Sequence, residues 1–161
     1  MKKEIEELIP NAIEATQKFL MTEDSKVQKE YDGYAASLGA AIRTSGLIPA
    51  LTFYTDVKRK DGDARRYKLL QAVAYCLDKK VDTQNDEHKR FLLREVIIDL
   101  YQGDVFNRQL TGRGRDERLP NINTVADFDK KKKCWTKKIT HASIALKLAM
   151  RNFEHSENPK S

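Results

Sequence analysis

The chain has 161 residues, with 30 Lys and Arg against 24 Asp and Glu, a formal net charge of +6 and 40% hydrophobic residues. At this length one domain can bury about 70% of the surface of the unfolded chain, so neither a disulfide scaffold nor a disordered tail is needed to explain the composition. Only seven glycines and four prolines are present, which argues against a turn-rich all-β sandwich and favours long helices.

The sequence carries no sign of export or of a membrane segment. No run approaches the roughly 18 apolar residues of a membrane span, and residues 1–7 turn acidic where a signal peptide would turn apolar. Cys76 and Cys134 lack Cys-x-x-Cys spacing and are expected to be two free thiols in a reducing compartment. We therefore expect a cytoplasmic protein that does not associate with membranes.

Apolar side chains recur at helical spacing along most of the chain, and nowhere do four or more residues alternate at period two. The first helix is expected to kink or restart at Pro10. Ser25 and Gln28 form a capping box that opens the second helix, and Gly46 suits the left-handed position that ends it. A third helix starts near Pro49 and is almost entirely apolar, which predicts a central position. These three helices are expected at about residues 2–21, 25–45 and 49–57.

The second half of the chain contains three more helical patterns and one long segment without a sustained period. The helices are expected at about residues 67–78, 91–101 and 124–153, the long loop at 103–123, and a disordered tail at 154–161. The sequence therefore predicts an all-α fold, a single-domain bundle of about six helices over residues 1–153 with a long last helix.

The residue types that carry out catalysis or bind metals are not grouped in the sequence. The three histidines are not paired at ligand spacing, which argues against a zinc site. Cys134 and His141 are two helical turns apart, too far for a direct hydrogen bond. The Asp-x-Asp pairs at 61–63 and 127–129 could hold a hard cation, but we interpret both as helix caps. We expect no enzyme activity, no metal and no cofactor.

Six aromatic residues could be taken for a surface on which bases stack, but they lie at the spacing of core positions. They are Tyr31, Tyr34, Phe53, Tyr54, Tyr67 and Tyr75. The helices on either side of Gly46 could imitate a helix-turn-helix, yet the second of them offers almost no polar or basic side chains for a DNA groove. A sequence-specific repressor is therefore disfavoured.

Basic residues form three clusters on a chain whose residues 1–32 hold five Lys against eight Asp and Glu, a balance of −3 that leaves +9 on the rest. On the last helix Lys130, Lys133, Lys137 and His141 share a stripe opposite Trp135, Ile139, Ala142 and Leu146. The second cluster comprises Lys58, Arg59, Lys60, Arg65, Arg66 and Lys68, and the third comprises Arg108, Arg113, Arg115 and Arg118.

Groups of cations of this kind suit a phosphate backbone and do not read base edges. The alternative is a solvated charged face, the usual place of lysine runs. Arg113 and Arg115 between glycines could also form an arm that becomes ordered only on RNA. The residues that we expect to bind nucleic acid are Lys58, Arg59, Lys60, Arg65, Arg66, Arg113, Arg115, Lys130, Lys133 and Lys137.

The segment at residues 34–54 reads Tyr-Ala-Ala-Ser-Leu-Gly-Ala-Ala-Ile-Arg-Thr-Ser-Gly-Leu-Ile-Pro-Ala-Leu-Thr-Phe-Tyr. It resembles the signature of the Cmr small-subunit family of type III-B CRISPR effector complexes, in which a Tyr/Ala helix ends in Ile-x-x-Asn/Ser-Gly-Leu and continues into Leu-Ala-Phe. Thr52 stands where that motif usually has Ala. The size, the basic charge and the last helix, which ends Ala-Leu-Lys-Leu-Ala-Met-Arg-Asn-Phe, are also similar to the family.

This resemblance implies a non-catalytic subunit, several copies of which stack head to tail beside the backbone subunits. They would form one wall of the groove that holds guide RNA and target RNA, while cleavage belongs to other subunits. The implied partners are these two RNAs, the backbone and large subunits of the Cmr complex, and copies of the chain itself. We expect the acidic first helix, with Glu4, Glu6, Glu7 and Glu14, to meet a basic surface of the next copy. The competing interpretation is a free-standing helical DNA-binding regulator or an antitoxin.

Overall fold

The computed structural model describes residues 2–55, 62–78, 91–101, 122–153 and 155–156, and within them the fold is all-α with six α-helices. The α-helices are α1 (Lys2–Ala15), α2 (Glu30–Ser45), α3 (Leu47–Thr55), α4 (Gly62–Leu77), α5 (Phe91–Tyr101) and α7 (Ile122–Met150). A π-helical turn, η1 (Thr16–Leu20), follows α1, and two short strands, β1 (Val27–Gln28) and β2 (His155–Ser156), complete the described elements. The predicted all-α bundle with a long last helix is confirmed.

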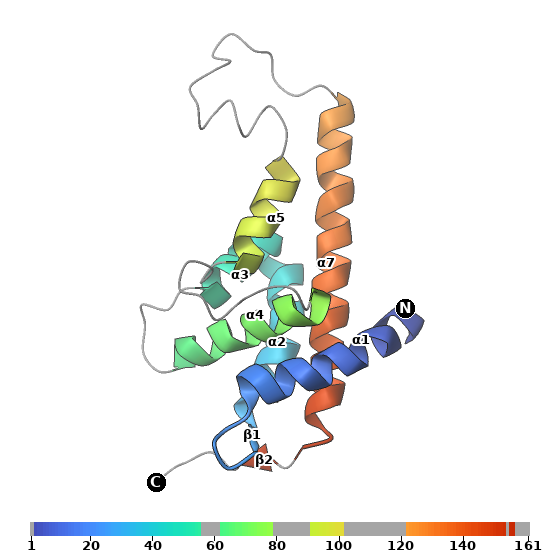
Figure 1. The fold of residues 1–161 in the computed structure, drawn as a ribbon. Helices are drawn as coiled ribbons and strands as arrows, with labels where there is room; N and C mark the ends of the chain where they lie inside the picture. The colour runs from blue at the N-terminus through green and yellow to red at the C-terminus, as the bar shows by residue number, and fades with distance from the viewer. Residues whose placement is uncertain (1, 56–61, 79–90, 102–121, 154, 157–161) are drawn as a thin grey trace.

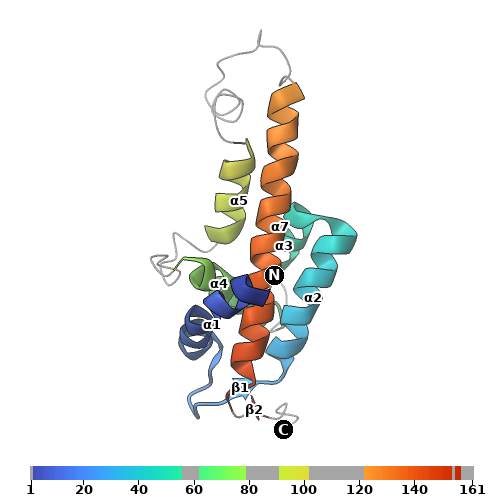
Figure 2. The same cartoon turned by 90° about the vertical axis from the view of Figure 1, so that its right-hand side faces the viewer.

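The 29-residue helix α7 is the element around which α1, α2, α4 and α5 pack, while α3 contacts α2, α4 and α5. Helix α5 runs beside its N-terminal half, while α1, α2 and α4 surround its C-terminal half (Figures 1 and 2). Ile139, Ala142 and Leu146 are fully buried on one side of α7, because residues three and four apart lie on the same helix face. The stripe predicted to pack is therefore confirmed at these three positions.

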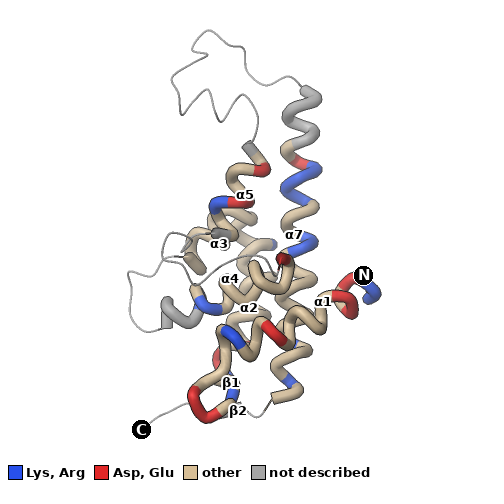
Figure 3. Tube along the Cα trace, viewed as in Figure 1, with Lys and Arg blue, Asp and Glu red and all other residues tan. Residues whose placement is uncertain are grey.

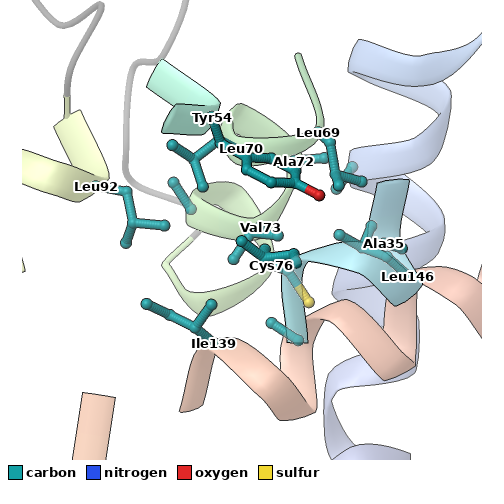
Figure 4. Close-up of a cluster of buried hydrophobic side chains, with 14 of the residues drawn as sticks. Ala35, Tyr54, Leu69, Leu70, Ala72, Val73, Cys76, Leu92, Ile139 and Leu146 are labelled. Carbon is teal, nitrogen blue, oxygen red and sulfur yellow. The ribbon is translucent and has the colours of Figure 1, made fainter. Parts of the chain in front are cut away.

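The centre of the core joins side chains from five helices (Figure 4). It contains Ala35 of α2, Tyr54 of α3, Val73 and Cys76 of α4, Leu92 of α5, and Ile139 and Leu146 of α7.

None of the described helices is long and apolar enough to cross a membrane.

The corner between α2 and α3 has the geometry that the sequence predicts. Gly46 has φ of 94° and donates its backbone N–H to the Ile42 carbonyl at 3.0 Å, and this left-handed φ strains any residue with a Cβ. Helix α3 begins at Leu47, so Pro49 occupies its first turn, where no intrahelical donor is needed. The Tyr54 hydroxyl donates to the Tyr34 carbonyl at 2.9 Å and ties α3 to α2.

The predicted capping box at Ser25 is wrong. Ser25 has φ of +58° and belongs to a tight turn in which Thr22 N–H donates to the Lys26 carbonyl at 2.7 Å. After the turn, Val27 is fully buried and lies in β1, so α2 does not begin until Glu30. Burial of the Val27 side chain in the core thus replaces the extra helical turn that the local pattern favoured.

Strand β1 pairs in parallel with β2, with Val27 opposite His155 and Gln28 opposite Ser156. The sequence predicts a disordered tail at residues 154–161, whereas two of these residues are held by this pairing. The remaining tail residues lie outside the described residues, as do residues 103–121 of the predicted loop. Ile122 and Asn123, which the sequence also assigns to that loop, belong to the start of α7, so this part of the prediction is wrong.

Other helix boundaries also differ from the sequence prediction: α3 begins and ends two residues earlier than predicted, and α7 spans Ile122–Met150 where residues 124–153 are expected. Helix α1 continues through Pro10, and the change in helix geometry comes at Thr16, whose hydroxyl donates to the Ala12 carbonyl at 2.7 Å. Helix α4 begins at Gly62, before the first position of its apolar pattern at Tyr67.

Candidate nucleic-acid interface

Three lysines of the predicted α7 stripe are exposed on one side of the helix: Lys130, Lys133 and Lys137. We call them the lysine stripe. They are spaced by three and four residues, and the buried side of α7 faces away from them. Figure 3 shows Lys and Arg positions along this part of α7, beyond the crossing with α1.

The sequence predicts His141 as the fourth exposed member of the stripe. This prediction is wrong, because His141 is only 7% exposed. Helix α1 crosses α7 at this level (Figure 1). The His141 Nδ1 atom lies 3.6 Å from the Glu4 carboxylate. The exposed stripe therefore ends at Lys137, where α1 begins to cover the helix.

Glu4 of α1 also contacts the last lysine of the stripe. The Lys137 ammonium lies 3.2 Å from a Glu4 carboxylate oxygen, and its hydrogen bond lowers the pKa of that carboxyl below the usual value. Sequence reasoning placed Glu4 against the next copy of the chain, whereas the structure pairs it within its own chain. Both side chains are largely exposed, with Lys137 at 60%, so this ion pair is accessible to solvent and screened by salt.

The other acidic residues of the first helix have different surroundings. The Glu14 carboxylate accepts a hydrogen bond from the Tyr75 hydroxyl at 3.2 Å. Glu6 and Glu7 are exposed. Glu6 and Glu7 therefore belong to the acidic surface of α1, while Glu4 and Glu14, also exposed, contact α7 and α4.

A neighbouring group on α7 has a structural role that the sequence did not indicate. The Trp135 indole N–H donates to the Asp99 carboxylate of α5 at 2.7 Å, and the Lys131 ammonium donates to the Asp99 backbone carbonyl at 3.3 Å. The Lys138 ammonium lies 5.4 Å from the centre of the Trp135 ring. The two hydrogen bonds to Asp99 attach α5 to α7 on the side opposite the lysine stripe.

The second basic cluster is described at Arg66 and Lys68 only. The Arg66 guanidinium lies over two aromatic rings, 5.1 Å from the centre of Tyr34 and 4.9 Å from the centre of Phe53. Arg66 thus joins α4 to α2 and α3, away from the lysines of α7. Lys68 is exposed. The remaining candidates lie outside the described residues, or have side chains that do: Lys58, Arg59, Lys60, Arg65, Arg113 and Arg115.

The prediction that the aromatic residues belong to the core is confirmed for Tyr31 and Tyr54, which are buried. It is wrong for Phe53, which is 53% exposed. Helix α3 buries Leu47, Leu51 and Tyr54, and a residue one position before Tyr54 projects about 100° away from it. Because one side of α3 faces solvent, the helix is not fully enclosed as its composition predicted.

The cysteines and histidines do not form a reactive group in the part of the chain that the structure describes. Both thiols are free, with Cys76 buried and Cys134 exposed, as the sequence predicts. Burial raises the pKa of Cys76 to about 12, which keeps this thiol protonated and unreactive at neutral pH. Among the described residues, no group of three or more His, Cys, Asp or Glu could hold a metal ion.

These features define a small all-helical protein whose long last helix exposes a row of lysines. Residues 6–104, more than half of the chain, match the family model described as CRISPR-associated protein (Cas_Cmr5), and the chain belongs to this family. The family is the small subunit of the type III-B Cmr complex, and its partners are the other Cmr subunits and the guide RNA.

The match includes the segment at residues 34–54 that carries the sequence resemblance, and it ends before α7. The searches of curated proteins and of solved structures give no match. Family membership favours the small-subunit interpretation over a free-standing regulator, and the matched residues do not include the lysine stripe.

Proposed function

We propose that this chain is a non-catalytic wall of the Cmr complex, in which the lysine stripe of α7 contacts the phosphate backbone of guide or target RNA. The observation that carries the proposal is the row formed by Lys130, Lys133 and Lys137 on a helix fixed by its buried opposite side. Seven helical residues span about 10 Å, a length comparable to roughly three phosphates along one strand.

The chemistry of the stripe favours contact without sequence selection. A lysine ammonium is a compact charge that attracts phosphate from many directions, whereas base readout uses bidentate side chains such as Arg or Asn. A subunit that accompanies guides of many sequences requires contacts of the first kind.

The test is RNA binding by the full chain over a range of salt concentrations, with a single-stranded RNA of mixed sequence. Replacement of all three stripe lysines by Ala should weaken binding equally for different sequences. It should also reduce the slope of log K against log salt by about 0.7 for each lost phosphate contact. The matched control is Lys132→Ala, an exposed lysine of the same helix about 160° round from Lys130 towards the packed side. If Lys132→Ala alone weakens RNA binding as much as Lys133→Ala alone, binding depends on the overall charge of the surface and not on the stripe.

The contact between Glu4 and Lys137 makes the three lysines unequal. Because Glu4 already occupies the Lys137 ammonium, Lys137→Ala should weaken RNA binding less than Lys133→Ala. Glu4→Gln removes the competing carboxylate and should strengthen binding, with a steeper salt dependence. If Glu4→Gln leaves both quantities unchanged, Lys137 does not face the RNA.

We further propose that copies of the chain stack through the exposed acidic residues of α1, Glu6 and Glu7, against a basic surface of the next copy. Reversal of both charges to Lys should weaken self-association, which sedimentation would detect at low salt. Association that is unchanged by this double variant would contradict the stacking model. The same result would leave the RNA-binding role of the stripe untouched, because these two residues are separate from it.

A further inference from the structure

Phe53 is the most exposed large apolar side chain among the described residues, and it lies beside a cation. Its exposure is 53%, against 37% for each of the two other exposed apolar side chains, Ile144 and Leu148. The Arg66 guanidinium lies 4.9 Å from the centre of the Phe53 ring and 5.1 Å from that of Tyr34. An aromatic ring and an arginine thus share one surface formed by α2, α3 and α4.

The ring is held in place by contacts on its own helix. Tyr54, the next residue, is buried and donates its hydroxyl to the Tyr34 carbonyl of α2 at 2.9 Å. The rings of Phe53 and Tyr54 meet edge to face with their centres 5.9 Å apart. The buried Tyr54 thus anchors the backbone of α3 at this point and packs against the Phe53 ring, which reduces the entropy that a ligand must remove from the ring on binding.

We propose that Phe53, with Arg66 and Tyr34 beside it, is a stacking site for an unpaired base of single-stranded RNA. This inference rests on the proposed RNA-binding function and adds a site on a different part of the surface. Single-stranded nucleic acid binds where a base can stack on an aromatic face and a cation attracts the backbone. Phe53 supplies the first element, and Arg66 supplies the second within the same contact.

The charge of Arg66 favours a nucleic acid over an apolar protein segment as the occupant. A hydrophobic partner that covered Phe53 would also remove water from the guanidinium beside it, at a cost in free energy. An RNA strand would offer that guanidinium a phosphate, and guanidinium planes themselves stack on bases. The excess of +9 charges on the chain after residue 32 adds a long-range attraction for the same occupant.

The experiment compares the full chain and its variants with two probes at low salt. One is a single-stranded RNA of mixed sequence, and the other is the same strand with abasic sites throughout its central part. Phe53→Leu keeps an apolar side chain but removes the π face. It should weaken binding of the first probe by about 5- to 150-fold, the range for one lost base–aromatic stack, and leave the second unchanged. Phe53→Trp should retain the binding of the first probe.

A second readout locates the contact directly. The RNA carries 5-iodouridine, which forms photo-crosslinks with aromatic rings stacked on it, and mass spectrometry identifies the crosslinked peptide. We expect the crosslink at Phe53 or Tyr34, with its yield lost in Phe53→Leu. The control is Ile144→Ala, which removes an exposed apolar side chain of α7 and should change neither affinity nor yield. Circular dichroism melting confirms that each variant is folded.

Each outcome decides between the two proposals. If Phe53→Leu binds both probes as the parent chain does, the stacking site is refuted, while the lysine stripe can still account for binding. If Phe53→Leu weakens both probes equally, the contact is to the backbone and stacking is refuted. A reduced slope of log K against log salt is expected only for the lysine-stripe variants, because a neutral ring displaces no counterions from RNA. A chain that binds neither probe refutes both proposals.

Discussion

Truncation of Leu146 to Ala tests the central packing of α7. Leu146 is fully buried on the side of the helix opposite the lysine stripe. The substitution removes three buried carbon groups, worth about 0.8 kcal/mol each by transfer, and leaves a cavity among rigid neighbours. We expect a loss of about 3–4 kcal/mol in the free energy of unfolding, which is a large share of the roughly 5–15 kcal/mol of a typical domain. The melting temperature should fall by about 6–15 °C.

The matched control is Leu148→Ala, two residues further along the same helix. It makes the same chemical change with the same effect on helix propensity, but Leu148 is 37% exposed, so little cavity forms and the loss should stay near 1 kcal/mol. Urea unfolding followed by circular dichroism gives both values, provided that the m-values agree. If the two variants lose equal stability, or if Leu148→Ala loses more, α7 does not face the core as described.

Three further predictions concern single groups. A maleimide should label Cys134 in the native protein and Cys76 only after unfolding, because Cys76 is buried and its pKa is raised to about 12. Peptide mass spectrometry measures the labelling of each thiol, and equal labelling rates in the native protein would contradict the burial of Cys76. Burial raises the pKa of Tyr31 and Tyr54 from 10 to about 12, so the stability they contribute is intact below pH 10 and is lost as the pH rises towards 12. Tyrosinate absorbance should show these two ionising last, together with unfolding. Asp99→Ala removes the acceptor of the indole N–H and should cost about 1–2 kcal/mol in urea unfolding; no loss would mean that this hydrogen bond does not stabilise the α5–α7 contact.

The regular parts of the fold could be predicted from the sequence because their periodicity is a local property. The spacing of Ile139, Ala142 and Leu146 identifies the packed side of α7 without any knowledge of what packs there. Gly46 is similar, because the left-handed φ that ends α2 restricts the residue at that one position. The exposure of Lys130 and Lys133 follows from the same periodicity.

The errors arose where a distant segment decides the outcome. Ser25 and Gln28 satisfy the pattern of a capping box, but the burial of Val27 and its pairing with His155, more than 120 positions away, hold the chain in another conformation. Phe53 fits the apolar pattern of α3, yet its side chain is 53% exposed, and among the described residues the Arg66 guanidinium of α4 covers its ring only in part. Local propensity is a weak preference that packing across the fold overrides.

The lysine stripe depends both on local periodicity and on a distant segment, so the sequence could predict it only in part. Periodicity places Lys137 and His141 on one face of α7, but whether that face is open depends on α1, which approaches from the other end of the chain. In the structure α1 buries His141, brings Glu4 to Lys137, and leaves Lys130 and Lys133 uncovered. Helix α1 of the same molecule thus limits the length of the exposed basic surface on α7. A contact of Lys137 with RNA must therefore compete with Glu4, while Lys130 and Lys133 lie beyond the part of α7 that α1 covers.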